Sequence, residues 1–302
     1  MRTVARGQRW NRSETISGYL FILPGIIGLS IFVVYPLIAS AYYALTSWNG
    51  AADPVFVGFK NFVYMFTQDL SFWPSLKATA IFAVLSVPSS LVLGLLLALL
   101  LNRSLPGIRL FRTLLYLPAV LPSIATLTLW KFIYNPDVGL ANQALKALGL
   151  PGSMWLGSYE MALPALVIVG LWGVGTTMII FLAGLQAVPP DLYEAARLDG
   201  AGTLNLFLRM TLPLISPVLF LQLVMGLISA LQAFNQAAVL TQGGPGFTTN
   251  LFMYSIYTNA FQNQSLGYAV AQVWVLFAII IVLTFFTFRF SSMWVYADGP
   301  ME

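Results

Sequence analysis

The chain has 302 residues, of which 59% are hydrophobic and 8% are charged, and its formal net charge is +4. Soluble domains carry roughly 25% Asp, Glu, Lys and Arg, so we expect an integral membrane protein. Cys and His are absent, which excludes disulfides, thiolate and histidine metal sites and Ser-His catalysis. None of the four lysines follows a glycine, so the chain lacks a Walker A phosphate loop. Any ATP would be hydrolysed by another chain.

Charge-free stretches predict where the chain crosses the membrane, because a spanning helix needs about 20 mostly apolar residues. A Gly-, Asn-, Gln- and Thr-rich segment at 240–266 divides the longest stretch in two. We therefore predict an all-α protein with six transmembrane helices, near residues 17–45, 77–101, 110–134, 161–187, 211–235 and 267–290. An N-terminal segment (1–16) precedes this domain (17–290), and a C-terminal tail (291–302) follows it.

The positive charges predict the orientation of the chain. With six spans both termini share one side, and that side would hold all ten arginines, against the four lysines on the other. The excess places both termini in the cytoplasm. The Arg-rich start followed by an apolar stretch is also compatible with a signal peptide. The stretch is too long for that and shows no convincing cleavage site, so we interpret it as a retained first span.

No charged residue lies deep in any predicted span. Ion-coupled carriers usually need such groups along their pathway, although a sodium site built from carbonyls stays open. The polar and aromatic residues that do occur suit a neutral polyhydroxylated ligand, and interhelical hydrogen bonding or interface anchoring is their alternative role. They are Ser123, Thr126, Thr128, Thr176, Thr177, Gln222, Ser229, Gln232, Asn235, Gln272, Trp172, Phe234 and Trp274.

Two local patterns predict backbone features of the spans. Small residues at four-residue spacing in the second span predict close helix packing: Ser90, Gly94 and Ala98. Prolines near helix ends free backbone carbonyls that must then face protein or water: Pro118, Pro122, Pro213 and Pro217.

The connection at about 188–212 differs from the others because it carries charges and helix formers. Its second part, residues 194–213, has the sequence EAARLDGAGTLNLFLRMTLP. We predict a short helix with Asp191 and Glu194 near its favourable N-terminal end, a sharp turn at Gly200, and a second amphipathic helix. The small side chains of Ala195 and Ala196 leave one face narrow enough to enter a partner's groove. Glu194 could pair with a partner arginine, whereas an ordinary solvated loop is the alternative.

This segment resembles the EAA loop of permease subunits in binding-protein-dependent ABC importers. The family pattern places Glu-Ala-Ala, Gly and Leu-Pro at the spacing of residues 194–196, 200 and 212–213. Met210 replaces the commoner Ile, which conserves volume. Further segments resemble the carbohydrate-uptake (maltose-type) branch: 21–24 (FILP), 35–36 (YP), 56–62 (FVGFKNF) and 240–245 (LTQGGP). The resemblance covers about residues 17–290.

The resemblance implies a type I importer core in the prokaryotic cytoplasmic (inner) membrane. This multi-pass chain would pair with a second homologous permease and two ATPase subunits, and an extracytoplasmic sugar-binding protein would deliver a di- or oligosaccharide. ATP and Mg would be bound by the ATPases, so we expect no cofactor in this non-catalytic chain. Membrane lipid is a further expected partner, and nucleic acid is not. The residues implied in ATPase coupling are Glu194, Ala195, Ala196, Asp199 and Gly200.

In maltose-type relatives, substrate contacts fall on the third, fourth and fifth spans. Counting from the matched motifs implies contacts at Ser123, Trp172, Gly173, Thr176, Gly226, Ser229 and Ala233. The chemistry of their side chains adds Gln222, Gln232 and Asn235, of which we select Gln232 as a site residue. Several relatives have larger groups where this chain has Gly226, Ala230 and Ala233. The departure implies either a roomier site for a larger sugar or a site mainly on the second permease.

Rival interpretations are weaker. An aquaporin needs two Asn-Pro-Ala half-helices, a mitochondrial-type carrier needs three charged repeats, and a rhomboid-type protease needs a histidine; the sequence has none of these. An importer of glycerol-phosphate esters stays open, although it would want a cation in the site. A polyamine importer would want carboxylates. An ion-coupled secondary carrier is the more distant alternative.

Overall fold

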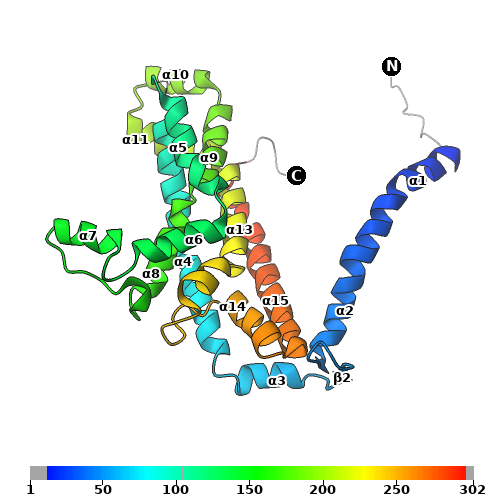
Figure 1. Cartoon of the computed structure of the whole chain (residues 1–302). Coiled ribbons are helices and arrows are strands. Elements are labelled where there is room, and N and C mark those ends of the chain that lie inside the picture. The colour runs from blue at the N-terminus through cyan, green and yellow to red at the C-terminus, as the bar shows by residue number, and fades with distance from the viewer. Residues whose placement is uncertain (1–11, 104, 297–302) are drawn as a thin grey trace.

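The structure, a computed structural model, describes residues 12–103 and 105–296. It confirms the predicted helical membrane fold: three helices are long and apolar enough to span a membrane, and three bent helix pairs bring the total to as many as six spans. Figure 1 shows the bundle. Most of the predicted N-terminal segment and the end of the predicted tail lie outside the described residues.

The first span stands away from the rest of the chain (Figure 1). It consists of α1 (Arg12–Leu29), the π-helical turn η1 (Ser30–Val34) and α2 (Tyr35–Ala44). The wide turn precedes Pro36, which has no N–H to continue the ordinary helical bonding. In the most apolar 18-residue stretch of this span, no residue is buried inside the chain. The buried share of the corresponding stretch is 28% in α4 (Phe72–Leu101) and 22% in α15 (Leu266–Ser291).

A small cap closes the end of the bundle where α2 meets α15. Strands β1 (Thr46–Ser47) and β2 (Val55–Phe56) pair antiparallel, with Thr46 opposite Phe56. Helix α3 (Lys60–Thr67) follows, and the Asn61 side chain donates to the carbonyls of Ala44 and Thr46 (2.8 and 2.9 Å). These two bonds attach α3 to the junction between α2 and β1.

Helix α4 is the central element, and the small-residue pattern packs as predicted. An added Cβ at Gly94 would lie 2.7 Å from the side chain of Thr177, so only glycine allows α9 (Gly175–Ala187) to approach this closely. Ala98 is fully buried. Ser90 and Thr177 are also in hydrogen-bonding reach at 3.5 Å.

The third, fourth and fifth spans are bent, although the sequence indicated three continuous helices. Helices α5 (Ile108–Val120) and α6 (Ser123–Ile133) meet at 96°, and α8 (Ala162–Trp172) and α9 meet at 51°. At the first bend Leu121 is extended, because the ring of Pro122 disfavours a helical residue before it. At the second, Gly173 separates the two helices.

The fifth span bends by 65° between α12 (Leu212–Leu214) and α13 (Ser216–Leu231). Pro217 has no N–H, so the carbonyl of Pro213 loses its helical donor. The hydroxyl of Ser216 donates to that carbonyl instead (2.6 Å) and accepts the backbone N–H of Tyr296 (2.7 Å). The described end of the chain is thereby attached to the bend. The carbonyl freed by Pro217 is thus satisfied by protein, as expected.

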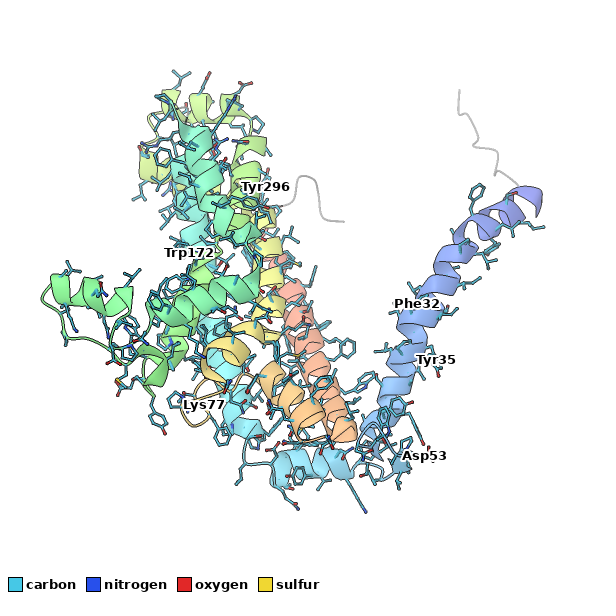
Figure 2. The ribbon with its side chains drawn as sticks, in the orientation of Figure 1. Phe32, Tyr35, Asp53, Lys77, Trp172 and Tyr296 are labelled. Atoms are coloured by element: carbon cyan, nitrogen blue, oxygen red, sulfur yellow. The ribbon has the colours of Figure 1, made fainter. Side chains whose placement is uncertain are left out.

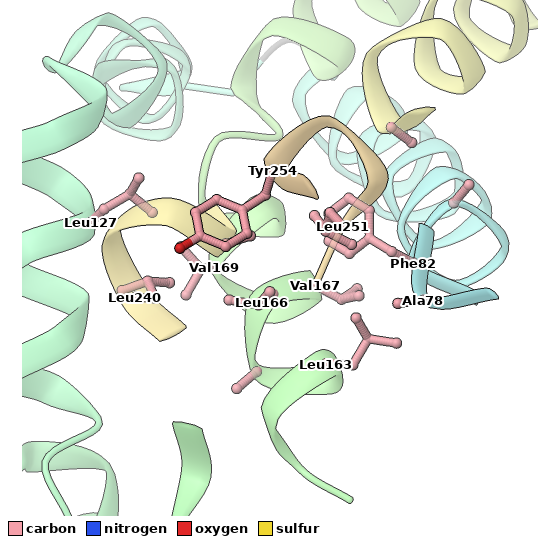
Figure 3. Packing of buried hydrophobic residues seen from close by; sticks show 14 of the residues in the cluster. Ala78, Phe82, Leu127, Leu163, Leu166, Val167, Val169, Leu240, Leu251 and Tyr254 are labelled. Carbon is pink, nitrogen blue, oxygen red and sulfur yellow. The ribbon is translucent and has the colours of Figure 1, made fainter. Parts of the chain in front are cut away.

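The connections contain further short elements. They are α7 (Leu140–Ala147), the 3₁₀ turn η2 (Trp155–Gly157), the π-helical turns η4 (Ala237–Thr241) and η5 (Thr258–Gln262), and α14 (Phe252–Tyr257). Figure 3 shows one of the buried apolar clusters, in which Phe82 of α4, Leu166 of α8 and Tyr254 of α14 belong to the same core. This core joins the bent fourth span to α4 and to the cap side of the bundle.

Candidate functional site

Two neighbouring cavities lie between the bent spans and α4. The larger has a volume of about 780 Å³ and the smaller about 280 Å³. Four residues line both: Gly170, Thr176, Asn235 and Gln236. Because they share these four residues, we describe the two cavities together and call them the central cavity.

The structure places every predicted substrate-contact residue in the wall of the central cavity. Gly226, Ser229, Gln232 and Ala233 line the larger part, and Ser123, Trp172 and Gly173 line the smaller part. Thr176 faces both. Residues predicted from three separate spans are thus brought together, and their contact with substrate remains a prediction.

The helix breaks position these side chains. Ser123 is the first residue of α6 after the 96° bend, and Gly173 lies in the break between α8 and α9. Gln232 caps the end of α13, where the chain leaves the helix. Each break therefore replaces a continuous apolar helix surface with a helix end that presents polar groups to the cavity.

Trp172 provides an aromatic surface at the end of α8 (Figure 2). Its ring packs edge-on against Trp130 with centroids 5.7 Å apart, and 48% of the residue is exposed. One side of the ring is thus held by protein while the rest is free. A fixed aromatic face is well suited to stacking on the apolar face of a sugar ring.

The wall carries hydroxyl and amide groups on a largely apolar lining, and the residues lining either part include no charged residue. Hydroxyl and amide groups alternate with small and apolar side chains. Gln222, Asn235 and Thr126, noted from their chemistry alone, also line it. Gln272 does not: it is buried elsewhere and accepts a hydrogen bond from Asn259 (3.0 Å).

Sequence reasoning missed two polar residues that line the larger part of the cavity, Ser86 and Gln236. The Oγ of Ser86 is buried and has no hydrogen-bond partner in the described structure. A serine in an apolar helix can bond to its own backbone, so the presence of a serine at position 86 does not indicate which face of the helix lines a cavity. Gln236 follows Asn235, and the run of polar residues after α13 could have indicated it.

The predicted helix–turn–helix, which we call the coupling loop, lies at the end of the bundle opposite α3 (Figure 1). Its first helix is α10 (Pro190–Leu198), and its second runs through α11 (Thr203–Leu206) and the π-helical turn η3 (Phe207–Thr211) into α12. Gly200 has φ +84°. Its N–H donates to Arg197 O and that of Ala201 to Ala196 O (both 3.0 Å), the Schellman pattern that ends a helix.

The coupling loop exposes the residues that sequence reasoning selected. Glu194, Ala195, Asp199 and Gly200 are exposed, and Ala196 is half-buried. Tyr193 is hydrogen-bonded to Thr211 through their hydroxyls (3.1 Å), which ties α10 to the second helix. The two helices therefore form one unit joined directly to the bend at Ser216.

Comparison with known proteins agrees with this geometry. Residues 90–296 match the family described as "Binding-protein-dependent transport system inner membrane component". Because the match covers more than half of the chain, the protein belongs to this family of transporter permease subunits.

Relatives match along nearly the whole chain. It is 36% identical to a probable ABC transporter permease, YesP, of Bacillus subtilis, covering 96% of this chain and 95% of that protein. It is also 36% identical to the trehalose/maltose transport system permease MalF of Thermococcus litoralis (90% and 92% covered). The sn-glycerol-3-phosphate transport system permease UgpA of Yersinia pestis is 36% identical with the same coverage.

A solved structure shares the fold. A chain of a bacterial ABC transporter that imports the acidic polysaccharide alginate superposes with a TM-score of 0.81 at 26% identity, covering 93% of this chain and 96% of that one. A bacterial alginate ABC transporter has also been solved in complex with a periplasmic protein bound to an alginate pentasaccharide (TM-score 0.80, 26% identity). The predicted type I permease fold is confirmed.

Proposed function

We propose that this chain is the membrane-spanning subunit of an ATP-driven importer for a neutral di- or oligosaccharide. The observation that carries the proposal is the wall of the central cavity, which offers hydroxyls, amides and the face of Trp172 but no charge. Neutral sugars are recognised by such groups. The trehalose/maltose permease among the relatives supports the same class of substrate.

A phosphate ester is the second candidate, because the sn-glycerol-3-phosphate permease is equally identical to this chain. A phosphate would want Lys or Arg in the wall, and the residues that line the central cavity include neither. The second permease would have to supply the cation. The wall therefore favours a neutral sugar.

The coupling loop supports a role in transmitting movement from an ATPase. Besides the exposed Glu194, two apolar side chains face solvent near the turn: Leu198 is 89% exposed and Leu204 is 69% exposed. A partner's cleft would bury these leucines and pair Glu194 with an arginine. Because Tyr193 is bonded to Thr211, movement of α10 would be passed to the fifth span.

The assembly we propose contains a second permease, two ATPase subunits and an extracytoplasmic binding protein, with the coupling loop and both termini in the cytoplasm. The solved relative bound to a periplasmic protein supports the last of these partners. The unburied first span offers a surface that a second permease would cover. ATP and Mg would be held by the ATPases.

The test is sugar uptake by the assembled transporter in proteoliposomes, with the binding protein present. The transporter is expected to take up a labelled neutral oligosaccharide and not glycerol phosphate; the reverse preference would overturn the substrate assignment.

A substitution in the coupling loop tests the coupling role. Glu194→Lys is expected to keep ATP hydrolysis but abolish uptake, because it places a cation where an arginine should bind. Asp137→Lys, an exposed acid in another loop, is the control. Normal uptake by Glu194→Lys would refute the coupling role.

A further inference from the structure

A third cavity lies at the end of α4 far from the coupling loop. Its volume is about 450 Å³, and it is bounded by α4, the start of α8 and the chain at 247–248. The wall is mostly apolar and includes Ile81, Leu85 and Leu163. Two residues of opposite charge also line it, Lys77 and Glu160. Lys77 is labelled in Figure 2. We call this space the α4 groove.

The α4 groove is separate from the central cavity. A helix turns about 100° per residue, so Ile81 in the groove and Ser90 in the central cavity, nine residues later, lie on opposite faces of α4. A second permease that closed the central cavity would therefore lie on the other side of this helix. The groove faces the surroundings of the bundle.

The two charges do not neutralise each other. Lys77 and Glu160 are both exposed; Lys77 lies on α4, and Glu160 lies in the turn before α8. Within residues 12–103 and 105–296, neither forms an ion pair. The groove thus presents a separate cation and anion beside an apolar wall. The matching ligand carries both charges on one headgroup and an apolar chain.

The depth of the residues fits a lipid. Helix α4 has 30 residues and is about 45 Å long at 1.5 Å per residue, against roughly 30 Å for the hydrocarbon core. Its first turns, with Lys77, therefore lie at headgroup level. Ile81 and Leu85 follow about 6 and 12 Å further along the helix, where acyl chains begin, and they are 40% and 41% exposed.

We propose that the α4 groove binds one phospholipid with a zwitterionic ammonium–phosphate headgroup, from the leaflet opposite the coupling loop. Lys77 binds the phosphate and Glu160 binds the ammonium group. One acyl chain lies along Ile81 and Leu85, beside Leu163. Charge-assisted contacts of this kind are stronger than neutral hydrogen bonds, and the two opposite charges select against a purely anionic lipid.

The test is native mass spectrometry of the full chain, purified in mild detergent and offered equal amounts of phosphatidylethanolamine and phosphatidylglycerol. The wild type is expected to retain one phosphatidylethanolamine in preference. Lys77→Gln should lower its retention about tenfold, the loss of one charge-assisted contact. Glu160→Gln should abolish the preference over phosphatidylglycerol. Lys146→Gln, on α7 and outside the groove, should change nothing.

A variant that leaves both charges in place tests the acyl chain. Ile81→Trp fills the groove and is expected to displace the lipid, while the unfolding temperature shows whether the chain stays folded. The proposal is overturned if the wild type retains both lipids equally, if Lys77→Gln matches Lys146→Gln, or if Ile81→Trp keeps the lipid. Crosslinking of Ile81→Cys to a second permease would also overturn it.

Discussion

Replacing Ser216 by alanine tests whether one hydroxyl stabilises the bend in the fifth span. Ser216 is 4% exposed. Its hydroxyl donates to the carbonyl of Pro213 and accepts the backbone N–H of Tyr296. Ser216→Ala removes both bonds without adding volume. The carbonyl of Pro213 then has no substitute donor in the helix, because Pro217 has no N–H.

The expected loss follows from the surroundings of the two orphaned groups. A buried acceptor left without a donor costs about 1–3 kcal/mol. The Tyr296 residue is 49% exposed, so water can replace the lost partner of its N–H at little cost. Because Pro213 is itself half-buried, we expect the free energy of unfolding to fall by about 1 kcal/mol, the lower end of that range, nearly all of it from the carbonyl of Pro213.

The measurement is unfolding of the purified chain by SDS titration in mixed micelles. Thr287→Val is the matched control. The hydroxyl of Thr287 also donates to a helix carbonyl, that of Leu283 (2.7 Å), but that carbonyl lies inside α15 and keeps its backbone donor. The control should change stability by less than about 0.5 kcal/mol. Equal effects of the two substitutions would refute the reasoning.

Two glycine predictions have internal controls. Gly200→Ala should destabilise the turn by about 1–2 kcal/mol because φ is positive there. Gly202→Ala, with φ −72° and open space, should cost less, because only the N-cap preference for glycine over alanine is lost; limited proteolysis of the coupling loop distinguishes the two. Gly175→Ala should cost about 1–3 kcal/mol, since its Cβ would lie 2.5 Å from Leu115 O. Gly170 lies in a helix, and a Cβ added there would have no neighbour within 4 Å, so Gly170→Ala should raise the free energy of unfolding by about 0.5–1 kcal/mol. Equal stabilities of Gly175→Ala and Gly170→Ala in SDS unfolding would contradict this.

Composition was sufficient to locate the apolar segments, which agree with as many as six spans, because crossing the membrane requires apolar length and little else. The direction of the helix axis within a span is not determined by composition. Hydropathy treats residues 110–134 as one segment, and only Pro118 and Pro122 indicated irregular backbone within it. The 96° angle depends on what α5 and α6 pack against, which a single sequence does not state.

The coupling loop could be predicted because its signals are local. Gly200 was expected at a sharp turn, and its positive φ and Schellman bonds follow from the absence of a Cβ. The cavity was partly predicted, through motif spacing that located Ser123, Thr176 and Ser229. Ser86 was missed because neither its spacing nor its chemistry says which face of α4 it occupies.

The break between α5 and α6 has a consequence for mutational studies. The first N–H groups of a helix have no partner within it, and no side chain caps α6 at Pro122. Because Ser123 and Leu121 both line the central cavity, the start of α6 with its uncapped main-chain donors lies beside that space. A substrate oxygen bound there would be held by atoms that every amino acid shares. Alanine scanning would leave such contacts intact, so recognition in this part of the cavity would be visible only to substitutions that move the backbone, above all at Pro122.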